Sequence, residues 1–217
     1  MAAKDAVIEA GSLTIHKLRG GPFDNNVYAL ICRETGESAL VDSSFGPERV
    51  LPVLKGTKLR FILQTHCHGD HVRALEALRA RTGAPVGLHP EEERRFGVRG
   101  DFQLNHGQRV AFGEQSLEVR HTPGHSPGGV LLVYPSHCIC GDTVFPGGPG
   151  KTGSPRDLQT LLASIEREVY TLPDETVLYP GHGENTTVGE SKKEYAVFRQ
   201  RGGPRPGQCG DVLWLGS

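Results

Sequence analysis

The first part of the chain alternates short apolar runs with turn-forming residues, which is typical of strands. Apolar and β-branched residues dominate the segments 13–18, 26–33 and 38–42, and Gly, Pro and Asn separate these runs. The segment 47–54 predicts a short helix, and the apolar run 58–65 is typical of a buried strand. This part of the chain therefore predicts a sheet that opens with a meander or hairpin.

Helices are expected between the later strands. The segment 72–81 places apolar residues at every third position, which predicts an amphipathic helix that ends at Gly83. A strand over 85–88 and a short acidic helix over 91–95 are expected next. Strands and helices thus alternate, as in a protein of the α/β class.

The second half repeats this alternation. Strand patterns in RVAFG, SLEVRHT, GVLLVY and HCIC fall within the segment 102–148 and indicate a second sheet. Ser154, followed by Pro and then an acid, predicts the start of a helix. A strand over 176–179 and a capping box over 187–190, which predicts a helix running toward Arg199, complete the pattern.

The length of 217 residues suits one domain with a sizeable core, and we expect a single domain over 1–217. Its tail, 202–217, is rich in Gly and Pro, which disfavours regular structure. The DVLWL segment within the tail is apolar and holds the only Trp of the chain. We therefore expect the tail to dock, either on this chain or on another subunit, and a homodimer is left open.

Composition excludes two classes of partner. The 24 basic and 25 acidic residues nearly cancel and form no like-charge run, so we expect no nucleic-acid partner. No apolar run reaches the roughly 18 residues that a membrane span needs, and the N-terminus lacks an export pattern. Five cysteines without a framework spacing fit reduced thiols. We therefore expect a cytoplasmic protein without a membrane partner.

Candidate metal ligands cluster where the strand 58–65 ends. The motif THCHGDH places His66, His68, Asp70 and His71 within six residues. Residues two apart at a strand end project to one side, so His66 and His68 can reach the same ion. Four ligand-type side chains exceed what one tetrahedral zinc takes from so short a loop, and this indicates two adjacent ions. A polar loop that merely caps strands is the alternative interpretation.

Three further candidates lie at the ends of later strands. They are His125 in HTPGHSPGG, Asp142 in CGDTVF and His182 in YPGHG, and glycines near each allow close backbone turns. Each alone is more typical of a turn residue. Together they supply an imidazole for each ion and a carboxylate able to bridge both. Two such ions can hold a shared hydroxide at neutral pH and polarise a carbonyl.

The motifs HCHGDH, HTPGH, GDTVF and PGHG occur in the order typical of the metallo-β-lactamase superfamily, which the chain resembles. This resemblance implies an αβ/βα sandwich, two mixed sheets flanked by helices, with the metals at one sheet edge. It also implies the ligands: the first ion is held by His66, His68 and His125, the second by Asp70, His71 and His182, and both by Asp142. Asp70 and Asp142 are the expected catalytic acids.

Within the superfamily, HTPGHS and GDTVF are similar to the glyoxalase II group, which hydrolyses thioesters of glutathione. The resemblance implies a binuclear hydrolase that cleaves a thioester or related acyl ester by attack of a metal-bridging hydroxide. Lys151 matches a lysine that holds glutathione in that group, and a solvated loop lysine is the alternative interpretation. Gly153 and Glu184 stand where the group has substrate-contacting tyrosines. The 35 residues after His182 (217 minus 182) also predict that its helical C-terminal domain is missing.

Two other functions remain open. A persulfide dioxygenase-like enzyme, which the GDT and HTPGH motifs also resemble, would hold one iron by His66, His68 and either His125 or Asp142. A non-enzymatic metal-binding module is the third hypothesis. For the two-ion hydrolase zinc is favoured, with iron or manganese as alternatives, and a small acyl ester or thioester is the expected partner.

Two residues outside the ligand set have two interpretations each. Asp42 ends the strand 38–42 and either orients a metal-bound histidine or caps local backbone. His89 precedes the helix expected over 91–95 and lies either at its entry or at the mouth of a pocket.

Overall fold

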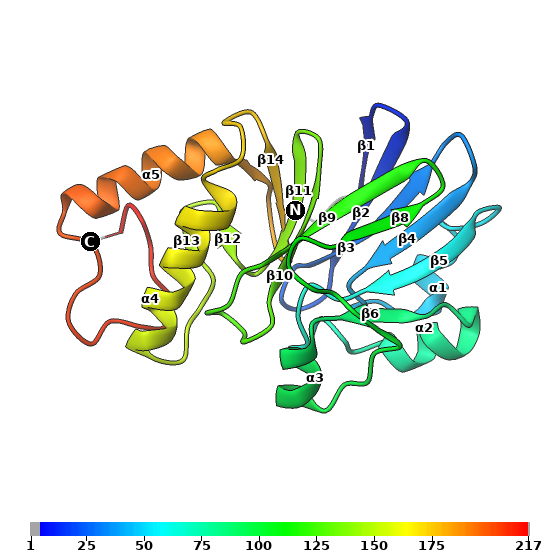
Figure 1. Cartoon of the computed structure of the whole chain (residues 1–217), viewed down its shortest axis with the longest axis horizontal. Helices are drawn as coiled ribbons and strands as arrows, with labels where there is room; N and C mark the ends of the chain where they lie inside the picture. Colours follow the sequence, from blue (N-terminus) through cyan, green and yellow to red (C-terminus); the bar gives the residue numbers. More distant parts are fainter. Residues whose placement is uncertain (1–4, 217) are drawn as a thin grey trace.

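The computed structural model describes residues 5–216 and contains two large mixed sheets (Figure 1). The strands of the first sheet follow chain order: β1 (Ala6–Ala10), β2 (Leu13–Gly20), β3 (Asn25–Cys32), β4 (Glu37–Val41), β5 (Lys58–Leu63), β6 (Val86–Leu88) and β7 (Phe102–Gln103). Strands β1 to β4 pair antiparallel, and β4 to β7 pair parallel. The parallel pairing of β4 with β5 matches Val41 to Leu63, so the segments after both strands leave the sheet at one edge.

The second sheet has the order β15-β14-β11-β10-β9-β8. Its strands are β8 (Arg109–Phe112), β9 (Gln115–His121), β10 (Val130–Tyr134), β11 (His137–Gly141), β14 (Val177–Pro180) and β15 (Thr186–Thr187). A small separate ribbon pairs β12 (Val144–Phe145) with β13 (Gly148–Pro149). Strands β11 and β14 are parallel and match Gly141 to Pro180, which brings the segments after them to the same edge.

Helices flank both sheets (Figure 1). They are α1 (Pro47–Val50), α2 (Leu75–Thr82), α3 (Pro90–Phe96), α4 (Pro155–Ser164), a π-helical continuation η1 (Ile165–Val169) and α5 (Val188–Gln200). The predicted starts of α4 and α5 are confirmed. Ser154 accepts a hydrogen bond from the Asp157 amide, and Thr187 accepts one from the Glu190 amide.

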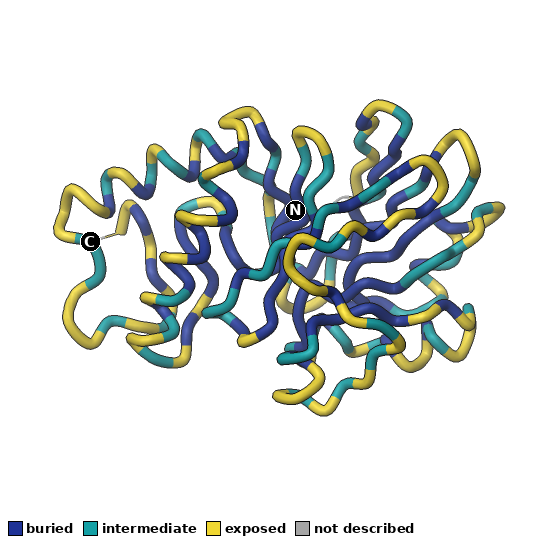
Figure 2. The backbone as a smooth tube through the Cα atoms, viewed as in Figure 1, coloured by how far each residue is buried: buried dark blue, intermediate teal, exposed yellow. Residues whose placement is uncertain are grey.

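Three apolar layers hold this arrangement together, and much of the backbone of both sheets is buried (dark blue in Figure 2). The central layer joins the inner faces of the two sheets, with Tyr28 and Leu132 among its members. A second layer packs α4 and α5 on the second sheet, and a third packs α1 and α2 on the first. Burial of apolar surface on both faces of each sheet is the main stabilising term. The αβ/βα sandwich expected from the sequence is therefore confirmed.

The boundaries differ from the sequence-based expectations in specific places. Helix α2 begins at Leu75 rather than at 72, because the preceding residues form a hydrogen-bonded turn in which the His71 amide donates to the His68 carbonyl (2.9 Å). Helix α4 changes to the wider π-helical pattern at Ile165 instead of continuing as an α-helix. The edge strand β1 and the two-residue strands β7, β12, β13 and β15 were not predicted.

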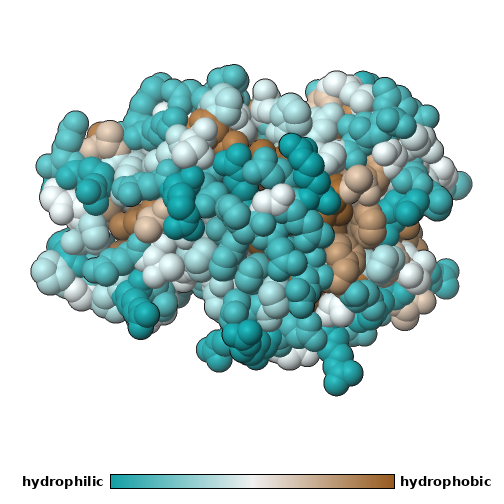
Figure 3. Space-filling view, in the orientation of Figure 1, coloured by the Kyte–Doolittle hydropathy of each residue, from teal (hydrophilic) through white to brown (hydrophobic). Residues whose placement is uncertain are grey.

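The tail docks on its own chain. The Trp214 ring is fully buried and lies 5.0 Å from the ring of Tyr195 and 5.2 Å from that of Phe198, both on α5. The Trp214 amide also donates to the Gly147 carbonyl at 2.7 Å. Among residues 5–216, no helix is both long and apolar enough to cross a bilayer. Hydrophilic side chains cover most of the face seen in Figure 3.

Candidate metal centre

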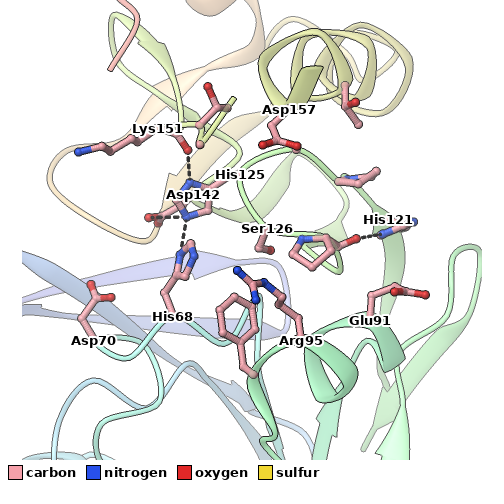
Figure 4. Close-up of a pocket in the computed structure, with 17 residues that line it drawn as sticks. His68, Asp70, Glu91, Arg95, His121, His125, Ser126, Asp142, Lys151 and Asp157 are labelled. Carbon is pink, nitrogen blue, oxygen red and sulfur yellow. Dashed lines mark hydrogen bonds and ion pairs between the residues drawn. The ribbon is translucent and has the colours of Figure 1, made fainter. Parts of the chain in front are cut away.

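All seven predicted ligands meet at the edge where the two sheets face each other. His66, His68, Asp70 and His71 follow β5, His125 follows β9, Asp142 follows β11 and His182 follows β14. The parallel pairs β4–β5 and β11–β14 bring the loops of both sheets to this edge. Figure 4 shows His68, His125 and Asp142 turned toward one another, with Asp70 across the same pocket.

The first group consists of His66, His68 and His125. His68 Nδ1 lies 2.9 Å from His125 Nε2, and His66 Nε2 lies 3.3 Å from the same nitrogen. All three nitrogens fall within 4.8 Å of one another. Three imidazoles converging on one point are a typical ligand set for a transition metal.

The second group consists of Asp70, His71 and His182. His71 Nε2 lies 3.1 Å from His182 Nε2. The Oδ2 atom of Asp70 is 3.3 Å from the nitrogen of His182 and 3.7 Å from that of His71. This group therefore offers two nitrogens and one carboxylate oxygen at a single point.

Asp142 lies between the two groups. Its Oδ2 is 3.4 Å from His125 Nε2 and 3.3 Å from His182 Nε2, while its Oδ1 is 3.5 Å from His71 Nε2. The Oδ1 atom is buried and has no hydrogen-bond partner among the described residues. A buried carboxylate oxygen without a partner is costly, and a bound cation would satisfy it.

In His125 and His182, a hydrogen bond from one ring nitrogen to a backbone carbonyl determines which nitrogen faces the centre. His125 Nδ1 contacts the Lys151 carbonyl at 2.7 Å, and His182 Nδ1 contacts the Phe23 carbonyl at 2.8 Å. Because a carbonyl only accepts hydrogen bonds, each Nδ1 carries the proton and each Nε2 presents a lone pair inward. Imidazoles that ligate metals are generally oriented in this way.

Asp42 contacts both a candidate ligand histidine and the local backbone. Its Oδ2 lies 2.9 Å from His71 Nδ1, and its Oδ1 accepts from the Thr65 amide at 2.8 Å. The first contact orients a histidine of the second group, and the second ties the end of β5 to the end of β4. Asp42 itself has a left-handed backbone with φ of 62°, which is uncommon for a residue other than glycine.

The electrostatics of the site favour positive charge. Burial raises the pKa of Asp142, but the neighbouring imidazoles of His71 and His182 outweigh burial and hold this pKa well below its usual value. Burial lowers the pKa of His71, but Asp142 and Asp42 outweigh it and raise this pKa well above its ordinary value. By contrast, burial and the charge on His125 lower the pKa of His68 to about 4. The carboxylates thus favour a cation at the second group, while burial favours the neutral form of His66 and His68 in the first group.

The backbone at Gly181 packs closely against the ligand side chains. A Cβ at Gly181 would collide with Asp142 Oδ1 and with the His71 ring, so only glycine leaves room for these two side chains. Asn25 donates to Asp70 Oδ2 at 2.8 Å and fixes the carboxylate of the second group. The loop that carries His182 is therefore packed directly against the ligands.

A pocket of about 980 Å³ opens in front of the centre. The charged side chains of its wall, seen in Figure 4, are Asp70, Glu91, Arg95, Asp142, Lys151 and Asp157. Lys151 is exposed and lies 3.6 Å from Asp211 of the tail, and Glu91 pairs with Arg94 at 2.8 Å. Arg95 has no carboxylate partner among the described residues. His89 is not among the residues that line this pocket, and its Nδ1 accepts from the Glu91 amide at the start of α3, as expected for a residue at the helix entry.

The sequence did not reveal two buried residues that support the ligand loops. Lys17 donates to the Gly183 carbonyl at 2.8 Å and to Asn185 Oδ1 at 2.7 Å, and burial lowers the pKa of Lys17 to about 8. Glu92 accepts hydrogen bonds from two loop amides. Neither belongs to a recognisable motif, since a lysine on a strand or an acid on a short helix is commonplace.

Comparison with known proteins shows the family of the chain. The profile of the metallo-beta-lactamase superfamily matches residues 20–182, well over half of the chain, and the chain belongs to this superfamily. A hydroxyacylglutathione hydrolase, GloC, from Haemophilus influenzae is 30% identical over 188 residues, which cover 76% of this chain and 89% of GloC. The mitochondrial persulfide dioxygenase ETHE1 of Homo sapiens is 32% identical over 161 residues, or 71% of this chain, and these residues span only 62% of the dioxygenase.

One of the similar solved structures contains bound metal. TTHA1623, crystallised in a di-iron-bound form, superposes with a TM-score of 0.68 and 32% identity, covering 82% of this chain and 96% of that protein. The family and the candidate ligand groups together imply divalent metal ions.

Proposed function

We propose that this protein is a binuclear metal-dependent hydrolase that cleaves a thioester or a related acyl ester. The observation that carries the proposal is the position of Asp142 between two groups of three ligand-type residues, with a buried oxygen that lacks a partner. A structural metal site closes with four protein ligands, whereas seven candidates around two ions leave room for water and substrate. The similarity to a hydroxyacylglutathione hydrolase supports the same reaction class.

In this proposal His66, His68 and His125 would hold the first ion, Asp70, His71 and His182 would hold the second, and Asp142 would serve as a ligand shared by the two groups. The lone pairs that face the centre and the negative charge of the two carboxylates fit divalent cations. Zinc is the favoured metal, with iron or manganese as alternatives, because all three accept mixed imidazole and carboxylate sets. Bound ions would supply Lewis-acid chemistry and lower the pKa of water.

The side chains around the pocket supply the remaining functions. Asp70 would orient the attacking water and accept its proton, a role supported by its position in the pocket wall and by its hydrogen bond from Asn25. Water adds to the acyl carbon, the carbon–sulfur or carbon–oxygen bond breaks, and the proton passes to the leaving group. Lys151 stands at the pocket rim, where an ammonium group can contact an anionic part of the substrate.

A persulfide dioxygenase is the second candidate, because relatives with this name are about as similar to the chain as the hydrolases are. Such an enzyme would use one iron held by His66, His68 and either His125 or Asp142. The completeness of the second group favours the hydrolase, since a one-metal enzyme has no need for Asp70, His71 and His182 together.

The deciding experiment is the metal content of protein purified without added metal, followed by a screen of thioesters and lactones. About two ions per chain with thioester turnover support the proposal. The Asp142→Ala variant should then lose turnover and metal, and full activity in this variant would exclude the binuclear mechanism. One iron per chain, together with oxygen uptake on persulfide substrates, would establish the dioxygenase instead.

A further inference from the structure

Glu92 is a fully buried acid on the short helix α3. Its Oε2 accepts a hydrogen bond from the Cys67 amide at 2.6 Å, and its Oε1 accepts one from the Gly128 amide at 2.7 Å. Hydrogen bonds from backbone amides to a carboxylate are short and strong, and low local polarity strengthens them. Both oxygens of the side chain are thus committed to backbone groups of other segments.

The two amides belong to the loops that supply the first ligand group. Cys67 lies between His66 and His68, and Gly128 lies three residues after His125. These loops follow strands of different sheets, β5 and β9. One carboxylate therefore ties together the two segments whose relative position determines whether three imidazoles converge.

The fit of α3 against these loops is close. A Cβ at Gly128 would lie 2.8 Å from Glu92 Cγ, so this contact requires glycine. The ring of His89 at the start of α3 stacks on that of His121 at 4.0 Å, which holds the helix against β9. At the other end of α3, Phe96 meets the His68 ring edge-on at 5.3 Å. Helix α3 is thus fixed along its whole length beside the first group.

We propose that Glu92 is a positioning residue of the metal centre: it sets the distance between the His66–His68 loop and the His125 loop, and thereby the affinity for the first ion. The inference rests on the proposed binuclear centre. A role in fold stability alone would lower the melting temperature without changing metal affinity or the turnover step. Metal affinity therefore separates the two roles.

The test compares Glu92→Gln with Glu93→Gln, an exposed acid on the same helix, in the full chain loaded with Zn²⁺. Glutamine has the same size, but its NH₂ group would face one of the two amide donors, so one hydrogen bond is lost. Competition with a chelator should show one of the two ions bound about 10- to 100-fold more weakly in Glu92→Gln, and both unchanged in Glu93→Gln. On a thioester substrate, kcat should fall by a similar factor, with KM nearly constant.

The conservative variant Glu92→Asp keeps both acceptor oxygens on a shorter stem. It should bind zinc more tightly than Glu92→Gln and less tightly than the wild type, and it takes the place of Glu92→Gln if that variant does not fold. Wild-type zinc affinity at both sites in Glu92→Gln, or in Glu92→Asp read in its place, overturns the inference. Weakened zinc binding in a protein that cleaves no thioester keeps the inference and removes the proposed function.

Discussion

The Oδ2 atom of Asp42 lies 2.9 Å from His71 Nδ1, and both side chains are completely buried. The same carboxylate accepts a hydrogen bond from the Thr65 amide. Asp42 thus links the ring of a candidate ligand to the strand that precedes the ligand motif. A contact of this kind fixes the orientation and the basicity of the imidazole.

Replacement of Asp42 by Ala should therefore weaken metal binding. We expect a loss of about 10- to 100-fold in affinity for the second ion, measured by chelator competition. Removal of a buried hydrogen-bonded acid should also lower the free energy of unfolding by about 3 kcal/mol in urea titrations. Unchanged affinity in a folded Asp42→Ala protein would show that His71 needs no partner on its outer nitrogen.

Arg95 should bind the anionic part of the substrate. Of the two cationic side chains that line the pocket, Lys151 pairs with Asp211, whereas Arg95 has no carboxylate partner in the described chain, so its guanidinium is available to a ligand carboxylate. In Arg95→Gln, KM should rise about 10-fold for a thioester with a carboxylate, consistent with a lost charged hydrogen bond of roughly 1.4 kcal/mol. A neutral thioester of similar size should show no change. Arg94→Gln is the matched control, and an equal rise for both substrates would contradict this role.

His89 should make stability depend on pH. Burial, followed by the charge of His121, lowers the pKa of His89 to about 4 from the ordinary value of 6.5. Between these values the unfolded chain binds more protons than the folded chain, so stability is full above pH 6.5 and falls as the pH decreases toward 4. His89→Asn keeps a side-chain acceptor for the Glu91 amide but does not titrate.

The free energy of unfolding of metal-free wild type should therefore decrease more steeply from pH 6.5 to 4 than that of metal-free His89→Asn. Metal-free protein is needed because the release of bound metal at acidic pH would add its own pH dependence to both curves. Parallel curves for the two proteins would mean that His89 is protonated at the same pH in the folded and unfolded chains.

Docking of the tail should contribute strongly to stability. Trp214 is fully buried against Tyr195 and Phe198, and its replacement by Ala leaves a large cavity. Loss of a buried aromatic ring costs about 3–5 kcal/mol, which urea unfolding would measure. Leu213→Ala is the control, because the Leu213 side chain is exposed. A similar small change in both variants would show that the tail detaches at little cost.

The sequence by itself determined the local features of this protein. The spacing of His66, His68, Asp70 and His71 marks candidate ligands, because residues two apart at a strand end share a side. Alternating apolar runs specify the strands, and the capping residues Ser154 and Thr187 specify where helices begin. These signals lie within a few residues, so a single chain reveals them without knowledge of its fold.

The tertiary structure decided which distant residues meet. Three contacts depend on how sheets and helices pack: that of Asp42 with His71, those of Glu92 with two loops, and that of Trp214 with α5. No short sequence pattern encodes them. The convergence of both ligand groups likewise follows from the parallel pairs β4–β5 and β11–β14. Residue types in the sequence indicate which side chains are candidate ligands. Long-range packing determines the distances between these side chains, because only the folded core holds the strands of two sheets in register.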